Sequence, residues 1–137
     1  MSDKAPSKIH DRYWLRTYSK VGNYPKHTER GGKWLIFAPL SEIDEWWNLI
    51  KPCTENGLLG GPSKVATARP NPNAKDPNIK VICVYTYDSD DKEDVMKVRE
   101  ELRKLGVTQK IPYKEDRATL EGKYQKRGHT KISKYYV

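Results

Sequence analysis

The segment Lys80–Tyr87 (KVICVYTY) constrains the fold more than any other part of the chain. It is dense in β-branched and aromatic residues, which predicts a strand near the middle of a sheet. An acidic turn follows at Asp88–Asp91, and apolar residues then recur at helical spacing as far as Leu105. Acids at the start of this helix and bases near its end suit the helix dipole, and Gly106 is the expected stop.

The same reasoning predicts a second helix from Ser41 to about Cys53, with Asp44 as a capping partner of Ser41 and Trp46 in the core. Pro112 favours an edge position for the last of the further strands, because proline cannot donate a ladder hydrogen bond. These strands are expected at Arg12–Tyr18, Lys33–Ala38, Ser63–Arg69 and Gln109–Lys114, and Lys131–Tyr136 could add one more.

The resulting order, β, β, α, β, β, α, β, predicts an α+β fold in which two helices cover one face of a mainly antiparallel sheet. The other face stays partly open, and ligands bind on such faces. At 137 residues the chain has room for one domain, so we expect a flexible basic leader at 1–10 and a single domain at 11–137.

Composition narrows the class of protein. The N-terminus lacks the apolar region of a signal peptide, and no apolar stretch approaches membrane-spanning length, so a cytoplasmic protein without membrane contact is expected. In that setting Cys53 and Cys83 are expected to be thiols. Three dispersed histidines and two lone cysteines do not form a ligand cluster, so we expect neither a metal nor another cofactor.

The net charge of +8 comes from the two ends of the chain. Residues 1–34 hold eight Lys/Arg against three Asp/Glu, as do residues 110–137, whereas residues 35–109 hold ten against twelve. If both ends fold onto one face, that face concentrates phosphates. The alternative is that these are scattered lysines that only keep the protein soluble.

Lys64 is the first candidate for phosphate chemistry, because it follows the turn Gly60–Ser63 at the start of a strand. Backbone amides of a glycine-rich turn and one ammonium group can cradle a phosphate, although the spacing is not that of a P-loop. A solvated lysine at a strand end is the alternative. Six further cations are candidates for pairing with phosphate: Arg30, Lys33, Arg69, Lys114, Lys123 and Arg127.

Two histidines, His27 and His129, are candidates for acid–base catalysis. Both lie in basic, turn-rich segments that favour neutral imidazole, the form that acts as a base, although each could equally be an exposed loop residue without a role. Aromatic side chains on strands could stack on a nucleobase. The candidates for that platform are Trp14, Trp34, Tyr85 and Tyr87.

Several segments, among them KWLIF, SKVATARPNPN, VICVYTYD and GHTKISKYY, resemble the basophilic-leukaemia-expressed protein family over about residues 13–136. The resemblance implies a curved antiparallel sheet backed by helices, as in the cap-binding translation initiation factor. It also implies a phosphothreonine lyase, in which Lys64 would be the base and Arg30, Lys114 and Lys123 could clamp phosphate. The Lys-Phe-His segment of such lyases is absent, so His27 or His129 would have to supply the acid.

Three hypotheses follow. The first is a binding module for a phosphorylated small molecule, a nucleotide or RNA, in a basic cleft lined by aromatic residues. The second is a metal-independent enzyme acting on a phosphate ester, either a lyase or a phosphodiesterase for RNA or cyclic oligonucleotides. The third is a scaffold whose basic ends contact an acidic protein.

Overall fold

The structure is a computed structural model that describes residues 5–72, 74–116 and 133–137. Its centre is a six-stranded sheet with the order β1-β3-β4-β2-β5-β6, in which every neighbouring pair is antiparallel. The strands are β1 Trp14–Thr17, β2 Gly32–Pro39, β3 Ser63–Ala66, β4 Ile79–Thr86, β5 Pro112–Glu115 and β6 Tyr135–Tyr136. The helices are α1 Leu40–Glu55 and α2 Lys92–Lys104, and a short 3-10 helix, η1, spans Pro6–Lys8.

The segment predicted at Lys80–Tyr87 forms β4, and its expected position near the middle of the sheet is confirmed. β4 pairs with β2 over eight residue pairs, from Gly32 opposite Thr86 to Pro39 opposite Ile79. On its other side β4 pairs with β3. Long strands rich in Val, Ile and aromatic residues form this ladder because their branched side chains pack well on a pleated surface.

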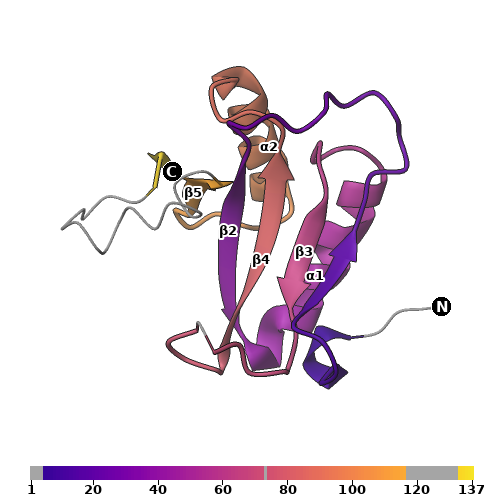
Figure 1. The fold of residues 1–137 in the computed structure, drawn as a ribbon, viewed down its shortest axis with the longest axis vertical. Helices are drawn as coiled ribbons and strands as arrows, with labels where there is room; N and C mark the ends of the chain where they lie inside the picture. The colour runs from indigo at the N-terminus through magenta and orange to yellow at the C-terminus, as the bar shows by residue number, and fades with distance from the viewer. Residues whose placement is uncertain (1–4, 73, 117–132) are drawn as a thin grey trace.

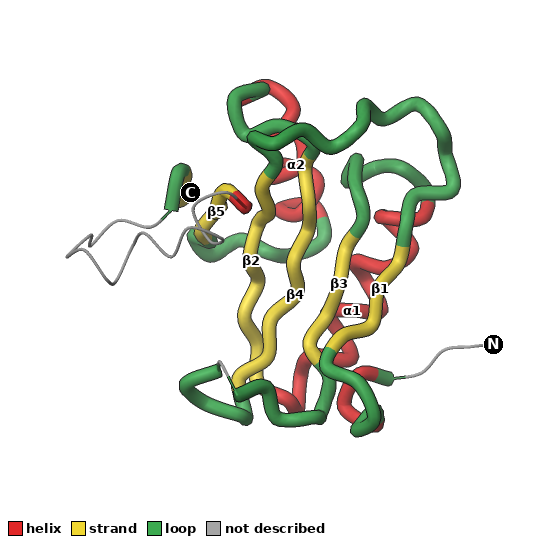
Figure 2. The backbone as a smooth tube through the Cα atoms, in the orientation of Figure 1, coloured by secondary structure: helices red, strands yellow, loops and turns green. Residues whose placement is uncertain are grey.

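Both helices lie behind the sheet in the view of Figure 1, and Figure 2 shows the same two-layer arrangement. The core between the layers is built from Trp34, Ile36, Val65, Ile82 and Val84 of the sheet with apolar side chains of both helices. All five of these sheet residues are at most 1% exposed. Each such side chain contributes roughly 1.5–3 kcal/mol through the area that it removes from water.

Helix α1 departs from the sequence prediction in two ways. Its buried stripe contains Trp47, which is 2% exposed, whereas Trp46 is only partly buried at the margin of the core. Spacing of four and three residues places Ile43, Trp47 and Ile50 on one face, and this face meets the sheet. The expected pairing of Ser41 with Asp44 is absent, because the helix begins one residue earlier, at Leu40.

Asp44 instead accepts hydrogen bonds from Ser7, at 2.9 Å from the backbone nitrogen and 2.5 Å from the hydroxyl. Pro6 is buried, and its carbonyl oxygen accepts from Ala68 N at 3.0 Å. Within the described part of the expected leader, η1 thus contacts α1 through Ser7 and the chain after β3 through Pro6.

Two other local predictions have clear outcomes. The Asp91 side chain caps α2 by accepting from Asp94 N at 3.1 Å, and Gly106 follows the helix with a φ of +111°, as expected. The edge position expected for β5 is wrong, because β6 pairs with it. Pro112 is tolerated because it is the first residue of β5, where a missing donor costs little.

Arg99 ties α2 to the C-terminal strands. Arg99 is 0% exposed, and its guanidinium donates to the carbonyl oxygens of Val107 (2.9 Å), Gln109 (2.7 Å) and Val137 (2.9 Å).

Neither α1 nor α2, the two α-helices of the described residues, is long and apolar enough to cross a membrane.

Replacing Arg99 with Met should lower the free energy of unfolding by roughly 3 kcal/mol, because it leaves three carbonyl oxygens without their donor. Urea denaturation followed by far-UV circular dichroism measures the change. The matched control is Arg103→Met on the same helix, where an ion pair with Glu100 is partly exposed and the loss should stay below about 1 kcal/mol. Equal losses in the two variants would contradict a structural role specific to Arg99.

Candidate functional site

The face of the sheet turned away from the helices carries a group of basic side chains. Because side chains alternate along a strand, burying Trp34, Val65 and Tyr113 against the helices turns their neighbours Lys33, Lys64 and Lys114 to the opposite side. We call this side the open face. The cation group on it consists of Arg16, Lys33, Lys64 and Lys114, which come from β1, β2, β3 and β5.

The strand register places these four residues close to one another. Arg16 lies opposite Lys64, and Lys64 lies opposite Cys83 of β4. Two residues further along β4, Tyr85 lies opposite Lys33 of β2, and Lys33 lies opposite Lys114 of β5 on its other side. With about 4.8 Å between neighbouring strands, the cation group extends over roughly 19 Å. Like charges directly opposite each other, as at Arg16 and Lys64, are unfavourable unless an anion is shared between them.

A small apolar layer lies beneath these cations. Leu35 and Cys83 are 6% and 3% exposed, yet they do not belong to the core between the sheet and the helices. The lysine side chains around them lie along the sheet: that of Lys33 is 13% exposed, and Lys64 and Lys114 are half-buried. Long basic side chains thus cover apolar surface with their stems and hold their charged ends above it.

This position changes the acidity of the groups on the open face. Burial is the main cause that lowers the pKa of Lys64, and the charges of Arg16 and Lys33 lower it further. Burial and the neighbouring Lys33 also lower the pKa of Lys114. The thiol of Cys83 has its pKa raised by burial to about 11. Cations that are partly dehydrated and close together are favoured by a bound anion.

The ammonium of Lys64 lies over the Trp14 ring, with Nζ 3.8 Å from the ring centroid. The glycines of the preceding turn have packing reasons of their own. Gly60 has a φ of +84°, and a Cβ there would lie 2.6 Å from the Tyr24 ring, while a Cβ on Gly61 would lie 2.9 Å from the Tyr85 carbonyl oxygen. The phosphate cradle expected from this turn therefore remains a prediction.

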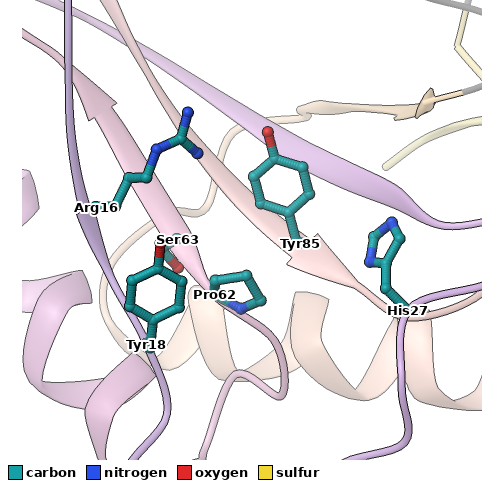
Figure 3. A pocket seen from close by; sticks show the side chains of 6 residues that line it. All are labelled: Arg16, Tyr18, His27, Pro62, Ser63 and Tyr85. Atoms are coloured by element: carbon teal, nitrogen blue, oxygen red, sulfur yellow. The ribbon is translucent and has the colours of Figure 1, made fainter.

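A pocket of about 250 Å³ opens at the end of this face (Figure 3). Arg16 from β1 and Tyr85 from β4 line it, and His27 of the 21–31 loop lies on the other side of the Tyr85 ring from Arg16 in this view. The His27 and Tyr85 rings meet edge to face with centroids 6.2 Å apart. Burial raises the pKa of the Tyr85 hydroxyl, so this group stays protonated and can donate a hydrogen bond.

His27 belongs to a chain of polar contacts that links two distant parts of the sequence. Its Nε2 lies 2.9 Å from Asp116 Oδ2, and the other oxygen of Asp116 accepts from Lys33 Nζ at 2.7 Å. Gly31 is required for this packing, because a Cβ there would lie 1.9 Å from His27 Nε2. The carboxylate both orients the imidazole and neutralises one member of the cation group.

The remaining predicted residues lie elsewhere. Trp34 is wrong as a stacking platform, because it is 0% exposed and its indole nitrogen donates to Val95 O at 3.1 Å in the core. Arg30 is held by Asp88 through Nη2 at 2.6 Å and Nε at 2.9 Å, so this guanidinium already has a carboxylate partner. The hydroxyl of Tyr87 donates to Asp91 at the start of α2.

Arg69 lies near the β1 edge, with its guanidinium 4.5 Å from the Tyr13 ring centroid and away from the cation group. Lys123, Arg127 and His129 lie outside the described residues. In the described ranges, no three His, Cys, Asp or Glu side chains gather in a way that could hold a metal ion.

The two basic ends of the sequence converge only in part. Lys33 and Lys114 come from the two end regions and are paired through β2 and β5. The first and last described residues nevertheless lie at opposite edges of the sheet, because β1 and β6 are its two edge strands (Figure 1). Sequence reasoning missed Arg16 and Asp116. The alternation in RYWLRTY, which puts Trp14 and Arg16 on one face, is the signal that could have found Arg16.

The model of the family described as "Basophilic leukemia-expressed protein Bles03" matches residues 26–120. The chain belongs to this family. The matched range contains Lys33, Lys64, Lys114 and Asp116, and it confirms the resemblance found in the sequence.

Solved structures share the fold. Two are schistosome eIF4E structures, one complexed with m7GpppA and 4E-BP and the other with m7GpppG and 4E-BP. Their TM-scores are 0.53 and 0.51, with identities of 15% and 17%, and each match covers 80% of this chain. The chain spans 60% and 59% of the length of those proteins. Likeness at this identity establishes the curved sheet backed by helices as a shared fold.

The lowered pKa of Lys64 predicts a pH-dependent effect of Lys64→Met, a change that keeps a chain of similar length over Trp14. Protonated Lys64 costs stability below its folded pKa, and the cost disappears as the pH rises through the unfolded value of 10.5. The stability of the variant relative to wild type should therefore fall as the pH rises toward 10.5, by less than about 1 kcal/mol because solvent screens a half-exposed ammonium.

Urea denaturation at several pH values measures this difference. The control is Lys26→Met in the 21–31 loop, an exposed position that reports the general effect of removing one lysine charge. A difference for Lys64→Met that does not change with pH would contradict the assignment of a dehydrated ammonium.

Proposed function

We propose that the open face binds the phosphates of a nucleotide or an RNA strand. The observation that carries this proposal is the convergence of Arg16, Lys33, Lys64 and Lys114 from four strands onto one surface. Lys33 Nζ lies 2.7 Å from Asp116 Oδ1, an ion pair at the margin of the cation group. A phosphate chain relieves the repulsion between these cations and releases counterions when it binds.

The same surface offers aromatic groups for a base. Tyr85 lies opposite Lys33, whose Nζ is 5.8 Å from the centroid of its ring, and Trp14 lies beneath the Lys64 ammonium. Basic side chains interleaved with aromatic rings are the usual equipment of proteins that bind single strands and nucleotides. Scattered solubilising lysines would be solvated, whereas Lys64 and Lys114 are half-buried and have lowered pKa values.

The fold supports the same class of ligand. The two schistosome eIF4E structures are complexes with m7GpppA and m7GpppG, so proteins with this fold can bind nucleotides that carry a phosphate chain. A cytoplasmic setting, in which such nucleotides and RNA are found, is part of the proposal.

The proposal predicts salt-dependent binding of a short oligoribonucleotide, measured by fluorescence anisotropy between about 50 and 200 mM salt. Three or four phosphate contacts on a single strand give a slope of about −2 to −3 in a plot of log affinity against log salt. Arg16→Gln should weaken binding about fivefold to tenfold at the lowest salt and make the slope shallower by about 0.7.

Lys104→Gln on α2 is the matched control, because it removes the same charge from the helix side of the molecule. Equal effects of Arg16→Gln and Lys104→Gln would show that net charge alone drives binding. Affinity independent of salt, or binding only to an acidic protein, would contradict the proposal.

A second function is favoured by one specific contact, the pair His27–Asp116 beside the Arg16 pocket. A carboxylate that orients an imidazole next to a cation can support cleavage of a phosphate ester without a metal. The geometry favours a phosphodiesterase over a lyase, because the Lys64 ammonium lies over Trp14 and does not line the pocket of His27.

Cleavage of RNA through a cyclic phosphate would need His27 as a general base for the 2′-hydroxyl. The test incubates the protein with a short RNA, a cyclic dinucleotide and a phosphothreonine peptide without divalent cations, and analyses the products by mass spectrometry. RNA fragments with a cyclic phosphate that disappear in His27→Gln would support this function. Loss of phosphoric acid from the peptide would point to a lyase, and activity retained in His27→Gln would exclude His27 as the base.

A further inference from the structure

A second pocket, of about 570 Å³, lies toward the other end of the open face. Pairing places Trp14 of β1 opposite Ala66 of β3, and Val81 of β4 opposite Phe37 of β2. All four residues line the pocket. Because Ala66 and Val81 are small, they leave a depression between the two larger rings, with roughly 14 Å between the outer strands. We call this depression the slot.

The slot is suited to a flat apolar ring. Phe37, the single phenylalanine of the chain, is 52% exposed, a high value for a large apolar residue. This exposure makes one face of its ring available for stacking. Arg16 and Lys64 lie two residues along their strands from the slot row, at roughly 7 Å. A base in the slot would thus be separated from the cation group by a distance that a sugar can span.

The charges around the slot are predominantly positive. Lys75, Lys80 and Lys114 line it, against Asp76 as the one carboxylate among its described lining residues. The Lys64 ammonium lies over the Trp14 ring. It thus occupies the position in which a positively charged base would gain a cation–π contact with this ring.

We propose that the slot binds the uncharged base of a nucleotide whose phosphates lie on the cation group, and that it discriminates against a positively charged base. This inference rests on the proposed function, and it deepens it by assigning the base a position and a charge. Aromatic and small apolar surfaces favour the base, and the ammonium groups of Lys64 and Lys114 repel a second positive charge.

Three probes separate the contributions in isothermal titration calorimetry at low salt: tripolyphosphate, GTP and 7-methyl-GTP, whose methyl group adds one positive charge to the ring. GTP should bind about tenfold more tightly than tripolyphosphate because its base stacks. The 7-methyl form should bind about fivefold to tenfold more weakly than GTP. Phe37→Ala should remove most of the gain from the base and narrow the difference between the two nucleotides, while the affinity for tripolyphosphate stays unchanged.

Leu49→Ala is the control, since Leu49 is 45% exposed on α1 and the change should alter none of the three affinities. Tighter binding of 7-methyl-GTP than of GTP would overturn the inference and leave the proposed function standing. Equal affinities for GTP and tripolyphosphate would also overturn the inference, as would a loss of tripolyphosphate binding in Phe37→Ala. Absence of binding for all three probes, tripolyphosphate included, would end both proposals.

Discussion

The ladder between β2 and β4 is the constraint on which the rest of the structure depends. Its eight antiparallel pairs fix which side chains of the two central strands meet the helices and which stand on the open face. A shift of one residue would turn every side chain to the other side of the sheet. Lys33 would then enter the core, and Trp34 would be exposed to water.

Contacts on the helix side of the sheet hold that register. Trp34 donates to Val95 O of α2, and the hydroxyls of Tyr113 and Thr86 lie 2.6 Å apart in the interior. Gly32 permits the last of these contacts, because a Cβ there would lie 2.5 Å from the Tyr113 ring. Residues that never touch a ligand therefore determine how Lys33 and Lys114 are presented on the open face.

Local patterns predicted the fold well, because strand propensity, helical spacing and capping are read within short windows. They identified Lys33, Lys64, Lys114 and Tyr85 as site candidates. They failed on Trp34 because KWLIF is apolar on both faces of the strand, so its alternation does not reveal which side meets the helices. Contacts between distant segments were also beyond their reach: His27 meets Asp116 across 89 residues, and the strand order that joins them is not encoded in either segment.

Holding the cation group on an apolar surface lowers the stability of the free protein. A protein that needed these charges only for solubility would leave them hydrated, where they cost almost nothing. Here Leu35 and Cys83 form an apolar floor beneath them, and burial lowers the pKa of both Lys64 and Lys114. Ammonium groups whose stems are already packed lose little freedom when an anion binds, so under the proposed function the stability given up in the free protein would be recovered as affinity for phosphate. The positions of these ammonium groups are set by the register of the strands, and that register is held by the core on the other side of the sheet.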